Sequence, residues 1–255
     1  MELTAILAIA YRDLLKFLRD GLRIVSTLVF PLIFIVILGN SFNSLNAGYN
    51  YLAYVFTGVF AQNLFQSTAM GIISLVEDRE NDFSQEIFVS PISRYSIIFG
   101  KIIGETMIAI LQGLAIIIVG IVIGIPMTWL QVLSLIPTGL VACIFGGSFG
   151  VLVLSGLSSQ RAANQIFPFL MLPQFFLAGI FNPIHDLPWF LDILSRLAPM
   201  RYAVDLVRGG FYLGQPESHL VVLSNPMTNL ALMTGLFLLF LVVGTWSFVR
   251  SEQNR

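Results

Sequence analysis

Few side chains in this 255-residue sequence have the type and spacing needed for catalysis or metal binding. Glu105 lies at the edge of a long apolar stretch, where it can reach the headgroup region or pair with Lys101 one helical turn earlier. His185 and His219 have no further ligand at the spacing of a metal site, and the single cysteine, Cys143, cannot form an intrachain disulfide. No Gly-x-x-x-x-Gly-Lys-Ser/Thr phosphate loop occurs. We therefore expect no catalytic residue and no metal site in this chain.

The strongest concentration of charge lies in residues 77–91, and its chemistry suits protein binding. A helix there would stop at Ser90, because Pro91 follows. Apolar side chains ringed by charges favour docking onto a soluble partner. A solvated connector whose aromatic side chains return to the membrane interface is the alternative. The residues expected to dock are Arg79, Glu80, Phe83, Glu86, Ile87 and Phe88.

A second polar segment, residues 182–225, is expected to form a hairpin of two short helices, 187–197 and 200–212, separated by Ala198-Pro199. The hairpin is too short and too charged to cross a membrane, so we expect it to be re-entrant or to lie at the interface. Spacings of i, i+4 and i, i+3 allow one stripe of charges to pair internally. The segment is expected either to gate the exit of a pathway or to form a stabilising cap. The gate candidates are Asn182, Pro183, Arg201, Asp205 and Arg208.

The elements that carry these segments are predicted to be transmembrane helices. The chain is 56% hydrophobic and only 11% charged, whereas soluble domains carry roughly 25% charged residues. No Asp, Glu, Lys or Arg occurs in residues 24–76, 106–160, 162–185 or 218–249. Because a span needs roughly 20 apolar residues, the first two stretches can hold two spans each and the others one. The six expected spans are residues 24–39, 51–76, 97–125, 130–157, 164–181 and 226–249.

Residues 1–23 are expected to form a basic amphipathic helix that lies in the membrane interface. Its four basic residues would share one helical face, opposite a stripe of apolar side chains. The basic residues are Arg12, Lys16, Arg19 and Arg23. Across the whole chain, ten Lys and Arg residues fall on the side of the termini and three on the side of residues 182–225, so we expect both termini in the cytoplasm.

Four features in this order resemble the type-2 ABC transporter permease family, the membrane subunits of ATP-driven exporters. The first is the basic helix before the first span. The second is Asp78-Arg79-Glu80 followed by Ser90-Pro91-Ile92-Ser93-Arg94. The third is Pro-Gln-Phe-Phe-Leu-Ala-Gly-Ile-Phe-Asn-Pro at residues 173–183, and the fourth is Ala-Pro-Met-Arg-Tyr-Ala-Val-Asp-Leu-Val-Arg at residues 198–208. The family often carries glycine where this chain has Asp82.

The resemblance implies an all-α membrane protein with a single permease domain over residues 1–255, in the prokaryotic inner membrane. It implies a homodimer or pseudodimer with two separate ABC ATP-binding subunits that hold ATP and Mg, and a coupling helix at residues 77–91 that enters those subunits. Spans one, two and five would line a pathway for a drug-like or lipid-like molecule. Alternatives are export of a polysaccharide or glycolipid, and a membrane scaffold without a transport cycle. The pathway candidates are Phe30, Phe34, Phe60, Phe65, Phe167, Phe169, Phe175 and Phe176.

Overall fold

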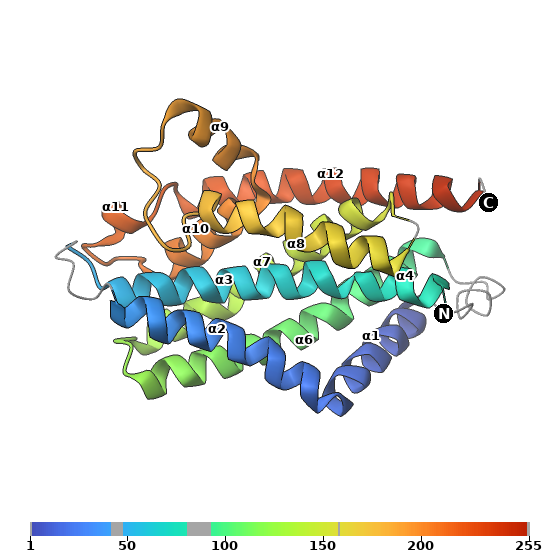
Figure 1. The fold of residues 1–255 in the computed structure, drawn as a ribbon, viewed down its shortest axis with the longest axis horizontal. Coiled ribbons are helices and arrows are strands. Elements are labelled where there is room, and N and C mark those ends of the chain that lie inside the picture. Colours follow the sequence, from blue (N-terminus) through green and yellow to red (C-terminus); the bar gives the residue numbers. More distant parts are fainter. Residues whose placement is uncertain (1, 42–47, 81–92, 158, 254–255) are drawn as a thin grey trace.

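The regular elements of the computed structural model, which describes residues 2–41, 48–80, 93–157 and 159–253, are all helices. The long helices run side by side in one bundle, and both chain termini lie at the end where α4 stops (Figure 1). The helices are α1 (Glu2–Arg19), α2 (Gly21–Ser41), α3 (Tyr51–Gly71), α4 (Ile73–Glu80), α6 (Arg94–Ile123), α7 (Trp129–Leu154), α8 (Gln160–Leu177), α9 (Trp189–Leu197), α10 (Pro199–Phe211), α11 (Ser218–Val221) and α12 (Pro226–Gln253).

Local capping residues set many helix boundaries. The Asn50 side chain accepts a hydrogen bond from the Ala53 N–H and starts α3, and the Ser93 side chain caps α6 in the same way. Thr128 and Gln131 form a capping box at the start of α7. α6 ends at Gly124, whose φ of 85° is a left-handed conformation that glycine adopts without strain.

Four helical segments are long and apolar enough to cross a membrane: Tyr51–Asp78, Tyr95–Ile123, Trp129–Leu154 and Ser218–Ser247. The pair Glu2–Arg19 and Gly21–Ile37, bent by 81°, gives a fifth candidate if it is counted as one span. The expected span at residues 164–181 corresponds to α8, which is not among these candidates. The structure therefore supports an all-helical membrane protein with four to five candidate spans, and the count of six stays a prediction.

The break between α1 and α2 corrects the expected interface helix over residues 1–23. α1 ends at Arg19, and the Asp20 carboxylate accepts a hydrogen bond from the Arg23 N–H in the first turn of α2. Arg23 therefore lies on α2, beyond the bend, and does not continue the basic face of Arg12 and Lys16. Within α1 the buried residues are Ala10, Asp13 and Phe17, so this helix packs a charged residue inward as well as apolar ones.

Helix α3 runs through the middle of the bundle and is buried on nearly all sides (Figure 1). Two glycine pairs allow close packing around it. Cβ atoms at Gly146 and Gly150 of α7 would overlap the α3 backbone, and Cβ atoms at Gly100 and Gly104 of α6 would press against α1. Small residues permit such close backbone approach between helices in a membrane. These glycines therefore pack helices within one chain.

The short helices α9, α10 and α11 lie at the end of the bundle away from the termini (Figure 1). α9 and α10 match the two helices expected in residues 182–225, and Pro199 occupies the first turn of α10. α10 is mostly buried, whereas α9 exposes Trp189 and Phe190. A re-entrant position for this segment in the membrane stays a prediction.

Candidate functional site

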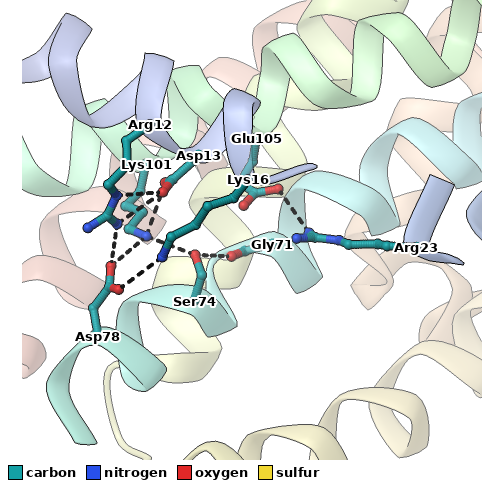
Figure 2. A network of polar contacts seen from close by, with 9 residues as sticks. All are labelled: Arg12, Asp13, Lys16, Arg23, Gly71, Ser74, Asp78, Lys101 and Glu105. Carbon is teal, nitrogen blue, oxygen red and sulfur yellow. Dashed lines mark hydrogen bonds and ion pairs between the residues drawn. The ribbon is translucent and has the colours of Figure 1, made fainter. Parts of the chain in front are cut away.

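Buried charges from three helices meet in one cluster (Figure 2), which includes α4 at the end of the bundle that holds the termini (Figure 1). Lys101 of α6 is only 1% exposed, and its Nζ lies 3.0 Å from Asp13 Oδ2 of α1 and 2.8 Å from Asp78 Oδ2 of α4. The Lys101 ammonium also donates a hydrogen bond to Ser74 Oγ at 3.0 Å. A buried charge is tolerated only when it is paired in this way. We call Arg12, Asp13, Lys16, Ser74, Asp78 and Lys101 the charged cluster.

Two further basic residues of α1 complete the charged cluster. Arg12 Nη2 lies 2.6 Å from Asp78 Oδ2 and 3.0 Å from Asp13 Oδ1. Lys16, which is largely exposed, places its Nζ 3.8 Å from Asp78 Oδ1. Asp78 is thus shared by cations from α1 and α6, so α4 is fastened to both helices just before it ends at Glu80.

Glu105 and Lys101 form no ion pair within the described residues, so the i, i+4 pairing, one of the two alternatives for Glu105, is wrong. Lys101 is turned toward Asp13 and Asp78, and Glu105 Oε2 instead lies 3.8 Å from Arg23 Nη2 of α2 (Figure 2). A Cβ at Gly71 would overlap the Glu105 side chain in its present position, so this buried carboxylate lies close against α3. Helix packing brings Asp13 and Asp78 close to Lys101 and brings Arg23 close to Glu105. Lys101 and Glu105 therefore pair with residues of other helices and not with each other.

A cavity of about 500 Å³ opens beside the charged cluster, a size in the usual range for ligand pockets. α2, α3, α4, α6 and α8 contribute to its wall. Arg23, Ser74 and Glu77 line its end nearest the charged cluster. We call it the amide-lined pocket, because its polar residues include Gln62, Asn63, Gln66, Gln112 and Asn164.

Two carbonyl oxygens of the amide-lined pocket are buried without a hydrogen-bond partner among the described residues. They are Oδ1 of Asn63 on α3 and Oε1 of Gln112 on α6. Gln62 and Gln66, by contrast, are hydrogen-bonded to each other, since Gln62 Nε2 donates to Gln66 Oε1 at 2.7 Å. Most buried polar side-chain atoms in proteins have a partner, so these two oxygens are exceptions among the described residues.

The pathway candidates are scattered in this structure. Phe30 lines the amide-lined pocket, and Phe34 stacks on Phe181 nearby. Three of the candidates are buried in the core, namely Phe60, Phe65 and Phe167. Phe169 and Phe176 of α8 are exposed, and Phe175 is partly buried. The pocket wall includes the three helices expected to line a pathway, but Phe30 is the one pathway candidate among its lining residues. The aromatic lining of a pathway stays a prediction.

The residues expected to dock onto a partner fall outside the part of the chain that the structure describes. Phe83, Glu86, Ile87 and Phe88 belong to residues 81–92, and the side chains of Arg79 and Glu80 are also not described. Their role stays a prediction. What the structure describes is the helix before them, α4, which carries Asp78 in the charged cluster and Ser74 in the pocket wall.

At the opposite end, Arg208 of α10 is 1% exposed and forms no ion pair within the described residues. Its guanidinium lies 3.6 Å from the centroid of the Tyr54 ring, and Nη2 donates to the Ile180 carbonyl at 3.0 Å. The Tyr54 and Tyr51 hydroxyls donate to the Gly179 and Phe181 carbonyls at 2.6 and 2.9 Å. Three consecutive carbonyls after α8, just before Asn182 and Pro183, are therefore capped by side chains of α3 and α10.

Asp205 caps a different connection, so the expected pairing of Arg201, Asp205 and Arg208 is wrong. The Asp205 carboxylate accepts hydrogen bonds from the Leu223 and Ser224 N–H groups at 2.7 and 2.8 Å and from Asn229 at 2.7 Å. Arg201 donates to Ser195 of α9 at 2.9 Å. Backbone groups in the connections around α10 are thus the partners of Asp205 and Arg208, whereas Arg201 binds side chains of α9.

Tyr212, at the end of α10, lies close to Arg208. Burial raises the pKa of the Tyr212 hydroxyl, although the Arg208 charge lowers it. The hydroxyl has no hydrogen-bond partner among the described residues. These contacts show where the side chains of the gate candidates lie, but they do not test whether the segment gates a pathway. The gating role therefore stays a prediction.

The family model described as ABC-2 type transporter matches residues 4–212. The chain belongs to the ABC-2 type transporter family. The match spans α1 to α10 and so includes the charged cluster, the amide-lined pocket and the capped connection after α8. Members are transport permeases, and they normally work with ABC ATP-binding subunits.

Two curated relatives carry names that agree with this family. The "Putative transport permease ycf38" of Cyanophora paradoxa is 25% identical over 197 residues, which cover 74% of this chain and 68% of that protein. The "Probable multidrug ABC transporter permease YbhR" of Escherichia coli (strain K12) is 28% identical over 141 residues, which cover 53% of this chain and 37% of that protein. The family assignment confirms the expected resemblance.

Sequence reasoning missed Asp13, Lys101 and the amide residues of the amide-lined pocket as site residues. Asp13 interrupts an otherwise basic helix, and such an acid on the inward face could have indicated a buried partner. Gln62, Asn63 and Gln66 form a polar group within a stretch of 53 uncharged residues, 24–76. Polar residues inside a membrane helix tend to face its partners or a cavity, so this group was a usable signal.

Proposed function

We propose that this chain is the permease subunit of an ATP-driven exporter that moves an amphipathic, drug-like or lipid-like molecule out of the cytoplasm. Two copies would assemble with two ABC ATP-binding subunits, which hold ATP and Mg. Six spans, cytoplasmic termini and a place in a prokaryotic inner membrane belong to the same proposal. Family membership supports the transport role, and the geometry of α4 supports the coupling.

One observation carries the coupling: α4 belongs to both functional regions. Ser74 lines the amide-lined pocket and accepts the hydrogen bond from Lys101, while Asp78 one turn later binds cations of α1 and α6. α4 then leads toward residues 81–92, which carry most of the expected docking residues. A displacement of that segment would therefore reach the pocket wall and the interface helix through the same short helix.

The test is association with an ABC ATP-binding subunit encoded next to this chain and co-expressed with it. Wild-type permease is expected to co-purify with that subunit in detergent and to change its rate of ATP hydrolysis. Phe83→Asp combined with Phe88→Asp is expected to abolish both, because two charges replace the apolar docking surface. The matched control is Trp189→Asp combined with Phe190→Asp, two exposed aromatic residues on α9 at the other end.

The control should retain association. Intact association in the Phe83 and Phe88 double variant would remove the coupling role of residues 77–91. If the wild-type chain bound no ATP-binding subunit and transported on its own, the proposed function would be wrong.

A further inference from the structure

We propose that Glu2 is a positioning residue for coupling, because it binds the chain at the point that follows residues 81–92. The inference rests on the proposed function, in which those residues carry most of the contacts to an ATP-binding subunit. Before them, Asp78 of α4 is bound by Arg12 of α1. Directly after them, Ser93 is bound by Glu2, which belongs to the same helix. α1 therefore holds the chain on both sides of residues 81–92.

The Glu2 carboxylate binds three donors at the start of α6. It accepts hydrogen bonds from the Ser93 N–H at 3.3 Å, from the Ser93 hydroxyl at 2.8 Å and from the Ser96 hydroxyl. Ser93 is the N-cap residue of α6, and the first turn of α6 contains no acidic residue. A negative charge stabilises the N-terminus of a helix. Glu2 thus supplies from α1 the charge that the start of α6 lacks.

From this contact onward, α1 lies directly alongside α6. Glu2 meets Ser93, and a Cβ at Gly100 would lie 3.0 Å from Ile9 Cβ; both contacts join residues 91 positions apart. The two helices are therefore parallel and in constant register. Arg12, in the charged cluster, follows Glu2 by ten residues of the same helix, or about 15 Å. A displacement of Ser93 relative to α4 must therefore move or strain α1.

The first test uses the full chain alone in detergent, with its purification tag at the C-terminus. Glu2→Ala removes an acceptor of the Ser93 N–H and the charge beside α6, so amide hydrogen exchange in residues 93–97 should become about three- to tenfold faster. Glu2→Gln keeps one acceptor oxygen and should stay closer to wild type. The matched control is Glu217→Ala, at a glutamate whose side chain makes no capping hydrogen bond to α11.

The second test uses the chain co-purified with the ATP-binding subunit. Glu2→Ala and Glu217→Ala should both associate with that subunit, because neither changes the expected docking residues. Glu2→Ala should lose most of the change in ATP hydrolysis rate that the wild-type permease causes, and Glu217→Ala should keep it. A merely stabilising role of Glu2 would lower the yield of the complex without lowering the response of each complex formed.

A covalent link separates anchoring from charge. Glu2→Cys combined with Ser93→Cys should lose the response, and a short bismaleimide that joins the two thiols should restore it. Cys143 is buried and should not react with the reagent. Glu2→Cys alone is the control, in which the same treatment should restore nothing.

Unchanged exchange in residues 93–97 of Glu2→Ala would overturn the inference. A full response of that variant, or no recovery after cross-linking, would overturn it as well. The exchange measurement needs no ATP-binding subunit. A wild-type chain that bound no such subunit would therefore count against the proposed function, whereas a wild-type response that Glu2→Ala retained in full would count against this inference alone.

Discussion

Two groups of buried charges lie at opposite ends of the helix bundle, and they are satisfied in different ways. In the charged cluster, Lys101 is paired with carboxylates from two other helices. At the other end, Asp205 and Arg208 form no ion pair within the described residues; they bind backbone groups of the connections around α10. The charged cluster thus joins helices to one another, whereas Asp205 and Arg208 hold the connecting segments around α10 in place.

The difference has a mechanical consequence. Asp78 has Arg12, Lys16 and Lys101 within ion-pair distance, so it can exchange partners when α1, α4 and α6 shift. A lysine on a flexible stem tolerates such shifts better than a planar, stacked guanidinium does. Arg208 over the Tyr54 ring permits little change. We expect the charged cluster to transmit movement and the opposite end to stay rigid.

Lys101→Met should give the largest effect, because it removes the most buried cation beside Asp13 and Asp78 and leaves them the more exposed cations of α1. Removing one partner of a buried pair lowers the free energy of unfolding by about 3 to 5 kcal/mol. Denaturant titration of the purified chain in detergent measures the change. The matched control is Lys16→Met: its side chain is 60% exposed, so a change of at most about 1 kcal/mol is expected.

Neutralising the acids together with the lysine sharpens this test. Lys101→Met combined with Asp13→Asn and Asp78→Asn should recover much of the lost stability, because neither buried acid then carries a charge. If the triple variant were less stable than Lys101→Met alone, the ion pairs would not explain the effect, and the comparison between the two ends would lose its basis.

Arg208→Met should have the next largest effect, about 2 to 3 kcal/mol, from the lost carbonyl hydrogen bonds and the lost stacking on Tyr54. The effect should be local. Amide hydrogen exchange in residues 178–184 should speed up more than in α7. Arg196→Met, at an exposed arginine of α9, serves as the control and should leave this segment unchanged. Uniformly faster exchange throughout the chain would contradict a fixed connection.

Asp205→Asn should give the smallest of the three effects, about 1 to 2 kcal/mol. The asparagine keeps one oxygen that can accept from the Leu223 or Ser224 N–H, but its NH₂ group would face the other donor. Hydrogen exchange at Leu223 and Ser224 measures the loss directly. A loss larger than that of Lys101→Met would reverse the ranking and break the comparison.

The sequence predicted the helical class and many helix boundaries. The apolar stretches matched α3, α6, α7 and α12, and the helices expected at 187–197 and 200–212 matched α9 and α10. These successes depend on local signals such as Ser93, Gly124 and the Ala198-Pro199 break. Such signals act within a few residues, so they can be recognised without knowing how the helices pack.

The partners of the buried groups could not be predicted in the same way. Arg12 and Asp78 are 66 positions apart in the chain, and Asn63 and Gln112 line one cavity only through the packing of α3 beside α6. The bend of 81° after α1 also redirected Arg23 toward Glu105. Composition and helix periodicity by themselves determined a helical membrane protein and its approximate segments. Only the tertiary structure decided which charges pair and which amides share a cavity, because those contacts depend on distances between helices that local sequence does not encode.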